Sequence, residues 1–82
     1  MSTLYYIGLD IHKKTISYCI KTLDGRLIGQ GKIDAGRKSV GEWVEGLPGP
    51  WIGAMEATIF TGWIYDFLTP YAVDLKVAHL RC

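Results

Sequence analysis

The first part of the chain reads as three strands. Residues 4–10 are apolar or aromatic at nearly every position, which is typical of a strand that is covered on both faces and lies centrally in its sheet. Residues 15–22 carry apolar side chains at every second position, the period of a half-buried strand. The dipeptide Asp24-Gly25 favours a type I′ hairpin turn, whose two central residues both need positive φ. An antiparallel strand is therefore predicted over residues 26–33.

The spacing of apolar residues becomes helical after this hairpin. A short amphipathic helix is expected to begin at Gly36 or Ser39 and to end before the breaker sequence GLPGP. Its apolar stripe comprises Val40, Trp43, Val44 and Leu47. Residues 51–57 are again a compact apolar run of strand length, with one acidic residue near the end. The middle of the chain thus predicts one helix and one strand.

A second helix and a last strand complete the pattern. Thr58 or Thr61 can cap this helix, and Pro70 should end or kink it because the residue before proline disfavours the α region. The apolar stripe comprises Phe60, Trp63, Ile64, Phe67 and Leu68. Residues 74–80 resemble a further strand. The order β-β-β-α-β-α-β predicts an α/β fold with a mixed sheet, in which the first strand lies beside the fourth.

Composition narrows the class of protein. The chain has 82 residues, of which 49% are apolar or aromatic, so we expect one small folded domain over residues 1–82. Cys19 and Cys82 match no zinc-ligand spacing and give no reason to expect a disulfide. The chain contains no apolar run long enough to span a bilayer and no charged leader, so we expect a cytoplasmic protein that does not contact membranes.

The net charge of +1 hides an asymmetry between the two halves of the chain. Residues 1–40 hold seven Lys or Arg against three Asp or Glu, whereas residues 41–82 hold two against five. This division would suit a site that holds cations beside a rim that binds phosphate, and ordinary solvated faces are the alternative explanation.

One acidic residue stands near the end of each of two apolar strands. Parallel neighbours in a sheet lie about 4.8 Å apart, so Asp10 and Glu56 would face each other across a short gap. Two carboxylates so placed repel unless a cation lies between them, and a hard divalent ion such as Mg²⁺ is the usual solution. Crevices in open α/β sheets also lie outside the carboxyl ends of strands. Each residue alone could instead form a turn or cap a helix.

The segments YIGLDIHKKTISYCI, LDGRLIGQGKI, GAMEATIFTGWIYDFL and DLKVAH together resemble the N-terminal part of the DEDD transposases of insertion sequences. These enzymes are relatives of the pilin-gene invertases, and their catalytic domain is RuvC-like with an RNase H fold. The resemblance covers residues 5–79. It implies DNA as the partner, DNA strand cleavage and transfer during transposition and recombination as the activity, and Mg²⁺ or Mn²⁺ as the cofactor.

The family uses four acidic residues to bind Mg²⁺. Asp10 matches the first and Glu56 the second, which makes them the candidate catalytic and metal-binding residues. The third and fourth, which in the family are paired aspartates on a helix further along the chain, have no expected counterpart because the sequence ends first. Asp66 falls in the middle of a predicted helix and Asp74 precedes a strand, so we expect neither to substitute. We therefore expect this chain to be a partial RNase H-like domain, truncated before the final helices, that is inactive alone and forms a homo-oligomer. A later serine domain and a structured RNA partner, which occur in the family, cannot be placed here.

Basic residues near the predicted site are candidates for contact with nucleic acid. His12, Lys13 and Lys14 follow Asp10 directly, so the lysines could contact phosphates while the histidine lines the site. Arg37 and Lys38 could grip a backbone at the start of the first helix. Plain solvation explains all five equally well. The three tryptophans, which could stack on bases, are expected to pack in the core: Trp43, Trp51 and Trp63.

Two other functions compete with the transposase reading. A lobe of an actin-like or sugar-kinase ATPase shares the apolar strand, the aspartate and the hairpin, but its phosphate-binding turn needs glycine two residues after Asp10, where this chain has His12. A truncated, non-catalytic product that only folds and associates is the third reading.

Overall fold

Five strands, two α-helices and one short 3-10 helix make up the part of the chain that the computed structural model describes, residues 4–56 and 62–78. In chain order they are β1 (Tyr5–Ile11), β2 (Thr15–Thr22), β3 (Leu27–Asp34), α1 (Arg37–Glu45), β4 (Trp51–Glu56), α2 (Gly62–Leu68), the 3-10 helix η1 (Thr69–Tyr71) and β5 (Asp74–Ala78). The predicted order of elements is confirmed.

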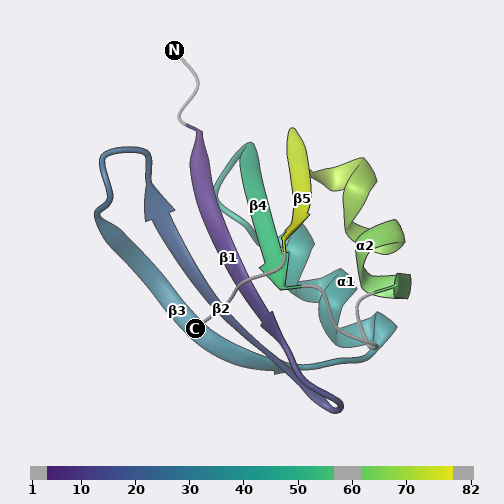
Figure 1. Ribbon diagram of the computed structural model, residues 1–82. Helices are drawn as coiled ribbons and strands as arrows, with labels where there is room; N and C mark the ends of the chain where they lie inside the picture. The colour runs from purple at the N-terminus through teal and green to yellow at the C-terminus, as the bar shows by residue number, and fades with distance from the viewer. Residues whose placement is uncertain (1–3, 57–61, 79–82) are drawn as a thin grey trace.

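The strands form a single mixed sheet in the order β3-β2-β1-β4-β5 (Figure 1). The β1–β2 and β2–β3 pairs are antiparallel, while β4 lies parallel to both β1 and β5. The first strand is therefore central and lies beside the fourth, as the connection through helices predicts. This adjacency brings the ends of β1 and β4 together.

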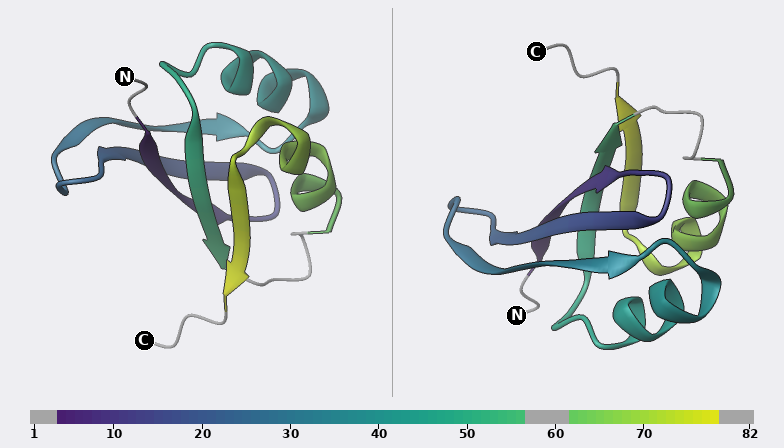
Figure 2. Two further views of the ribbon diagram at one scale, coloured as in Figure 1. Left: turned by 90° about the horizontal axis from the view of Figure 1, so that it is seen from above. Right: turned by 90° about the horizontal axis from the view of Figure 1, so that it is seen from below.

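Both helices cover the same face of the sheet (Figure 2). The connections from β3 to β4 and from β4 to β5 step the same way along the sheet, and right-handed crossovers that step the same way lie on one side. The prediction that residues 4–10 are covered on both faces is therefore wrong for the described residues. Tyr6 remains 43% exposed, whereas its neighbour Ile7 is fully buried.

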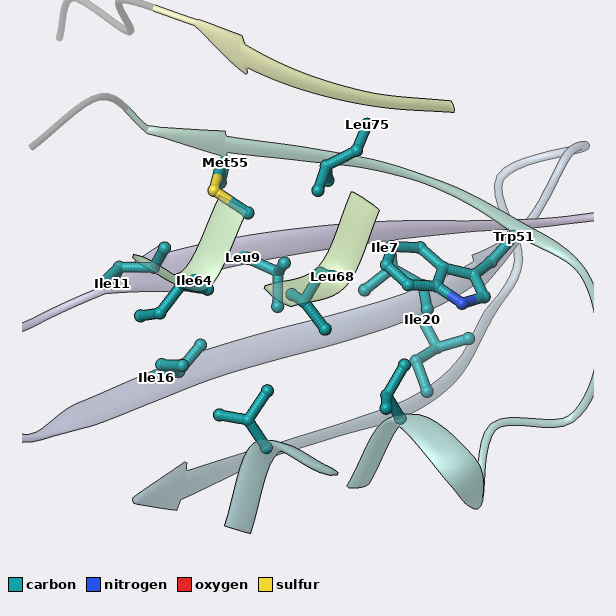
Figure 3. Packing of buried hydrophobic residues seen from close by; sticks show 12 residues of the cluster. Ile7, Leu9, Ile11, Ile16, Ile20, Trp51, Met55, Ile64, Leu68 and Leu75 are labelled. Carbon is teal, nitrogen blue, oxygen red and sulfur yellow. The ribbon is translucent and has the colours of Figure 1, made fainter. Parts of the chain in front are cut away.

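The core lies between this face and the helices (Figure 3). Odd-numbered residues of β1 and β4 point into it, together with two residues from each helix and side chains of β2 and β5. Its members are Ile7, Leu9, Ile11, Ile16, Ile20, Val40, Val44, Trp51, Met55, Ile64, Leu68 and Leu75. Because the even-numbered positions of β1 and β4 point away from the helices, they remain available for a site.

The predicted packing of the tryptophans is confirmed. Trp51 is only 2% exposed, and its ring meets that of Trp43 edge-on with 6.4 Å between centroids. The Trp43 ring also packs against that of Tyr18, with 5.1 Å between ring centroids. The centroids of Trp63 and Phe67 lie 5.9 Å apart. These rings pack against the core between the sheet and the helices.

The β2–β3 hairpin has a different turn from the predicted type I′. Gly25, with φ of 92°, is the one described residue in the positive-φ region, and Asp24 is outside it. The Gly25 N–H donates to the Thr22 carbonyl, and the Thr22 N–H donates to that of Arg26, which makes a three-residue loop with glycine last. Hydrogen bonds from the Thr22 hydroxyl and then the Arg26 N–H lower the pKa of Asp24. The turn is thus stabilised by hydrogen bonds to the Asp24 carboxylate, and Asp24 itself does not adopt positive φ.

Element boundaries otherwise agree with the sequence to within one or two residues. α1 begins after Gly36, one of the two predicted starts. α2 ends at Leu68, two residues before Pro70, in agreement with the prediction that this proline ends the helix, and η1 follows from Thr69. The proposed caps Thr58 and Thr61, like residues 79 and 80 of the last strand, lie outside the described residues. Within the described ranges, no helix has the length and apolar character needed to cross a membrane.

Candidate functional site

Asp10 and Glu56 are neighbours on one face of the sheet. Leu9 of β1 is paired with Met55 of β4, and these two acidic residues follow that pair directly on their parallel strands. Leu9 and Met55 both point into the core, so the next residue on each strand points to the opposite, open face. The two side chains therefore share a face at the carboxyl ends of adjacent parallel strands, whose backbones lie about 4.8 Å apart.

The two carboxylates differ in exposure. The Asp10 side chain is 57% exposed, whereas Glu56 is half-buried at the end of β4, between β1 and β5. Asp10 also borders a hollow of about 440 Å³ that runs along the open face. Its other lining residues on that face are mostly small: Tyr6, Gly8, Ser17, Cys19 and Ala54. Solvent and extended ligands can reach the Asp10 carboxylate from this side.

His12 contacts Asp10 directly, at 3.1 Å between Nε2 and Oδ2. The imidazole reaches back along the strand direction, because residues two apart on an extended segment project to the same face. The backbone of His12 is fixed as well, since its N–H donates to the Thr15 carbonyl at 2.8 Å. A rigid turn thus places a nitrogen donor against the first candidate carboxylate.

The predicted basic residues gather at the same edge of the sheet but on two sides of it. Lys13 and Lys14 are exposed in the β1–β2 turn, immediately beyond Asp10. Arg37 and Lys38 open α1, which follows the end of β3 at this edge on the side of the helices. The Arg37 guanidinium lies 4.8 Å from the centre of the Trp63 ring. Lys13 and Lys14 are therefore better placed than Arg37 and Lys38 to contact a ligand that reaches the Asp10 carboxylate.

Asp66 and Asp74 do not join this pair. Asp66 is exposed on α2, on the covered side of the sheet, and Asp74 is paired with Ile52 at the far end of β4. Four residues of strand separate that end from Glu56, or about 13 Å. Neither Asp66 nor Asp74 therefore lies beside Asp10 and Glu56.

The donor set suits a hard divalent cation that keeps much of its water. No group of three or more His, Cys, Asp or Glu side chains with metal-binding geometry occurs in residues 4–56 and 62–78. Mg²⁺, however, commonly binds through only one or two carboxylates and retains several waters. Asp10 and Glu56 could hold such an ion from one side, with its other positions open to water or to phosphate oxygens.

Two contacts at this edge went unrecognised in the sequence. The His12–Asp10 hydrogen bond has a signal, because residues two apart at a strand end share a face. The Arg37–Trp63 contact has no such signal, since it depends on how α1 and α2 pack together.

No family model matches the chain, and no curated protein shows a significant match to it.

Proposed function

We propose that this chain provides two carboxylates of an RNase H-like site for divalent-metal-dependent phosphodiester transfer on DNA, as in the DEDD transposases that its motifs resemble. The observation that carries the proposal is the position of Asp10 and Glu56. They follow a paired Leu9 and Met55, on one face, at the carboxyl ends of adjacent parallel strands. The sheet order and the element order are compatible with an RNase H-like arrangement.

Each group has a distinct task in this proposal. A divalent ion, when bound, would lower the barrier by stabilising charge on the attacking and leaving oxygens. The Asp10 and Glu56 carboxylates hold the ion at the sheet edge, and Lys13 and Lys14 attract the phosphates of the strand. Since two carboxylates provide only part of a two-ion site, we propose that catalysis needs further acidic ligands beyond this pair.

Mn²⁺ binding tests the carboxylate pair. Asp10→Asn and Glu56→Gln should each weaken Mn²⁺ binding by at least about tenfold, because each removes one of two anionic ligands. The titration is read from the free Mn²⁺ signal in electron paramagnetic resonance. Asp74→Asn is the matched control, as it removes an exposed carboxylate from the same face at the far end of the sheet. Equal affinities for all four proteins would exclude the proposed site.

DNA binding tests the two lysines of the turn. Replacing Lys13 and Lys14 together by glutamine should weaken binding of a short duplex and flatten its salt dependence by about one unit of slope for each lost phosphate contact. Fluorescence anisotropy at several salt concentrations gives both quantities. Replacing Lys21 by glutamine is the control, because this exposed lysine is paired with Tyr6 near the opposite end of β1, and the change should leave the slope unchanged. A slope that does not respond to Lys13 and Lys14 would remove them from the DNA interface.

The ATPase alternative has less support from this turn. A phosphate-gripping turn uses backbone N–H groups, whereas the His12 N–H is already bonded to the Thr15 carbonyl and the His12 ring occupies the space beside Asp10. This arrangement leaves the turn a poor match for nucleotide phosphates.

A further inference from the structure

We propose that His12 is a positioning residue for the carboxylate pair: it orients Asp10 so that one carboxylate oxygen is turned toward the ion while the other is held by the imidazole. This role rests on the proposed function and adds to it, because metal binding by the carboxylates alone does not account for the histidine beside Asp10. The observation behind it is the 3.1 Å contact between His12 Nε2 and Asp10 Oδ2.

The chemistry of the two groups fixes the direction of the hydrogen bond. An ionised carboxylate can only accept, so the His12 Nε2 carries the hydrogen and donates it to Oδ2. One oxygen of Asp10 is thereby engaged, and Oδ1 is the oxygen left for a cation beside Glu56. Asp10 is then held as a ligand through a single oxygen. This geometry suits a small ion that keeps its waters, in preference to one that takes both oxygens of a carboxylate.

The backbone helps to hold the His12–Asp10 hydrogen bond in an exposed place. The side chains of Asp10 and His12 are both 57% exposed, so the hydrogen bond alone would hold neither of them strongly. The His12 N–H, however, is bonded to Thr15 and continues the ladder between β1 and β2. The Cα of His12 is therefore fixed relative to that of Asp10, so forming the contact costs rotation about side-chain bonds but no further backbone freedom.

Three variants of one residue separate orientation from shape and charge. His12→Phe keeps a planar ring but cannot donate, so Asp10 should rotate more freely and Mn²⁺ should bind about three- to tenfold more weakly. His12→Gln places an amide N–H near the position of Nε2 and should restore affinity to within about twofold of the original. His12→Ala should behave as His12→Phe does. Because His12 is exposed, all three should keep the circular dichroism spectrum of the starting protein.

Each result of this Mn²⁺ titration decides something definite. Weaker binding by the phenylalanine variant with recovery by glutamine supports orientation of Asp10. Equal or tighter binding by the phenylalanine variant overturns the proposal, and tighter binding would mean that the imidazole competes with the ion for Oδ2. Failure of the unchanged protein to bind Mn²⁺, or unchanged affinity after Asp10→Asn and Glu56→Gln, would overturn the proposed function and this role with it.

Discussion

Truncation of Leu68 to alanine should lower the free energy of unfolding by about 3 kcal/mol, within the range of about 2–5 kcal/mol seen for buried leucines. Leu68 is the last residue of α2 and is fully buried against the sheet, in the same cluster as Met55 and Ile64 (Figure 3). The described part of α2 spans seven residues, and because helices in proteins are stabilised mainly by tertiary packing, we expect burial of this kind to hold it. Urea denaturation followed by circular dichroism measures the change.

The loss would be a large share of the total stability. A chain of 82 residues is expected to have about 4–12 kcal/mol in all. Val73→Ala is a suitable control, because that aliphatic side chain is 64% exposed and its removal should cost less than about 0.5 kcal/mol. If both substitutions had the same effect, α2 would not be packed on the sheet as described.

Substitution of Gly53 by alanine should cost about 2 kcal/mol, although it adds only one methyl group. A Cβ at this position would lie 2.6 Å from Cζ3 of Trp51 and 2.9 Å from Cδ1 of Leu75. Both neighbours are buried, at 2% and 6% exposure, so neither side chain can swing into solvent. The same denaturation experiment measures the loss.

Gly8→Ala is the matched control, because it makes the same change on the neighbouring strand. Gly8 is paired with Ala54, the residue after Gly53, and faces the open side of the sheet. Among the described residues, a Cβ there would approach only the Cys19 Sγ, at 3.2 Å. The expected change in stability is below about 1 kcal/mol, partly offset by the lower entropy of the unfolded chain. Equal costs at the two glycines would contradict a sheet that is covered on one face only.

The adjacency of β1 and β4 was predictable because helical connections return the chain in the same direction. The number of covered faces was predicted wrongly, because residues 4–10 contain Tyr6 and Gly8 at the positions that face away from the helices. An exposed tyrosine and a residue without a side chain look apolar in the sequence whether or not anything covers them. The handedness of the two crossovers carries this information, and it becomes usable only with the strand order.

The candidate site was predictable in part for a related reason. Asp10 and Glu56 each end an apolar run, and the register of two parallel strands decides whether they meet. A shift of one residue would have turned one carboxylate into the core, and the sequence alone does not give the register. The turn at Asp24-Gly25 was predicted with the wrong type. This dipeptide forms part of a three-residue loop, in which Thr22 and Arg26 donate hydrogen bonds to the Asp24 carboxylate.

Alternate residues of β1 and β4 are under different constraints, because one set faces the helices and the other faces the open side of the sheet. Odd-numbered residues such as Ile7 and Met55 are constrained by volume, because every change there is felt by the helices. Even-numbered residues such as Asp10 and Glu56 lie on the open face, where packing against the helices does not limit their volume. Side chains on the open face could therefore change during evolution while the same small fold persists.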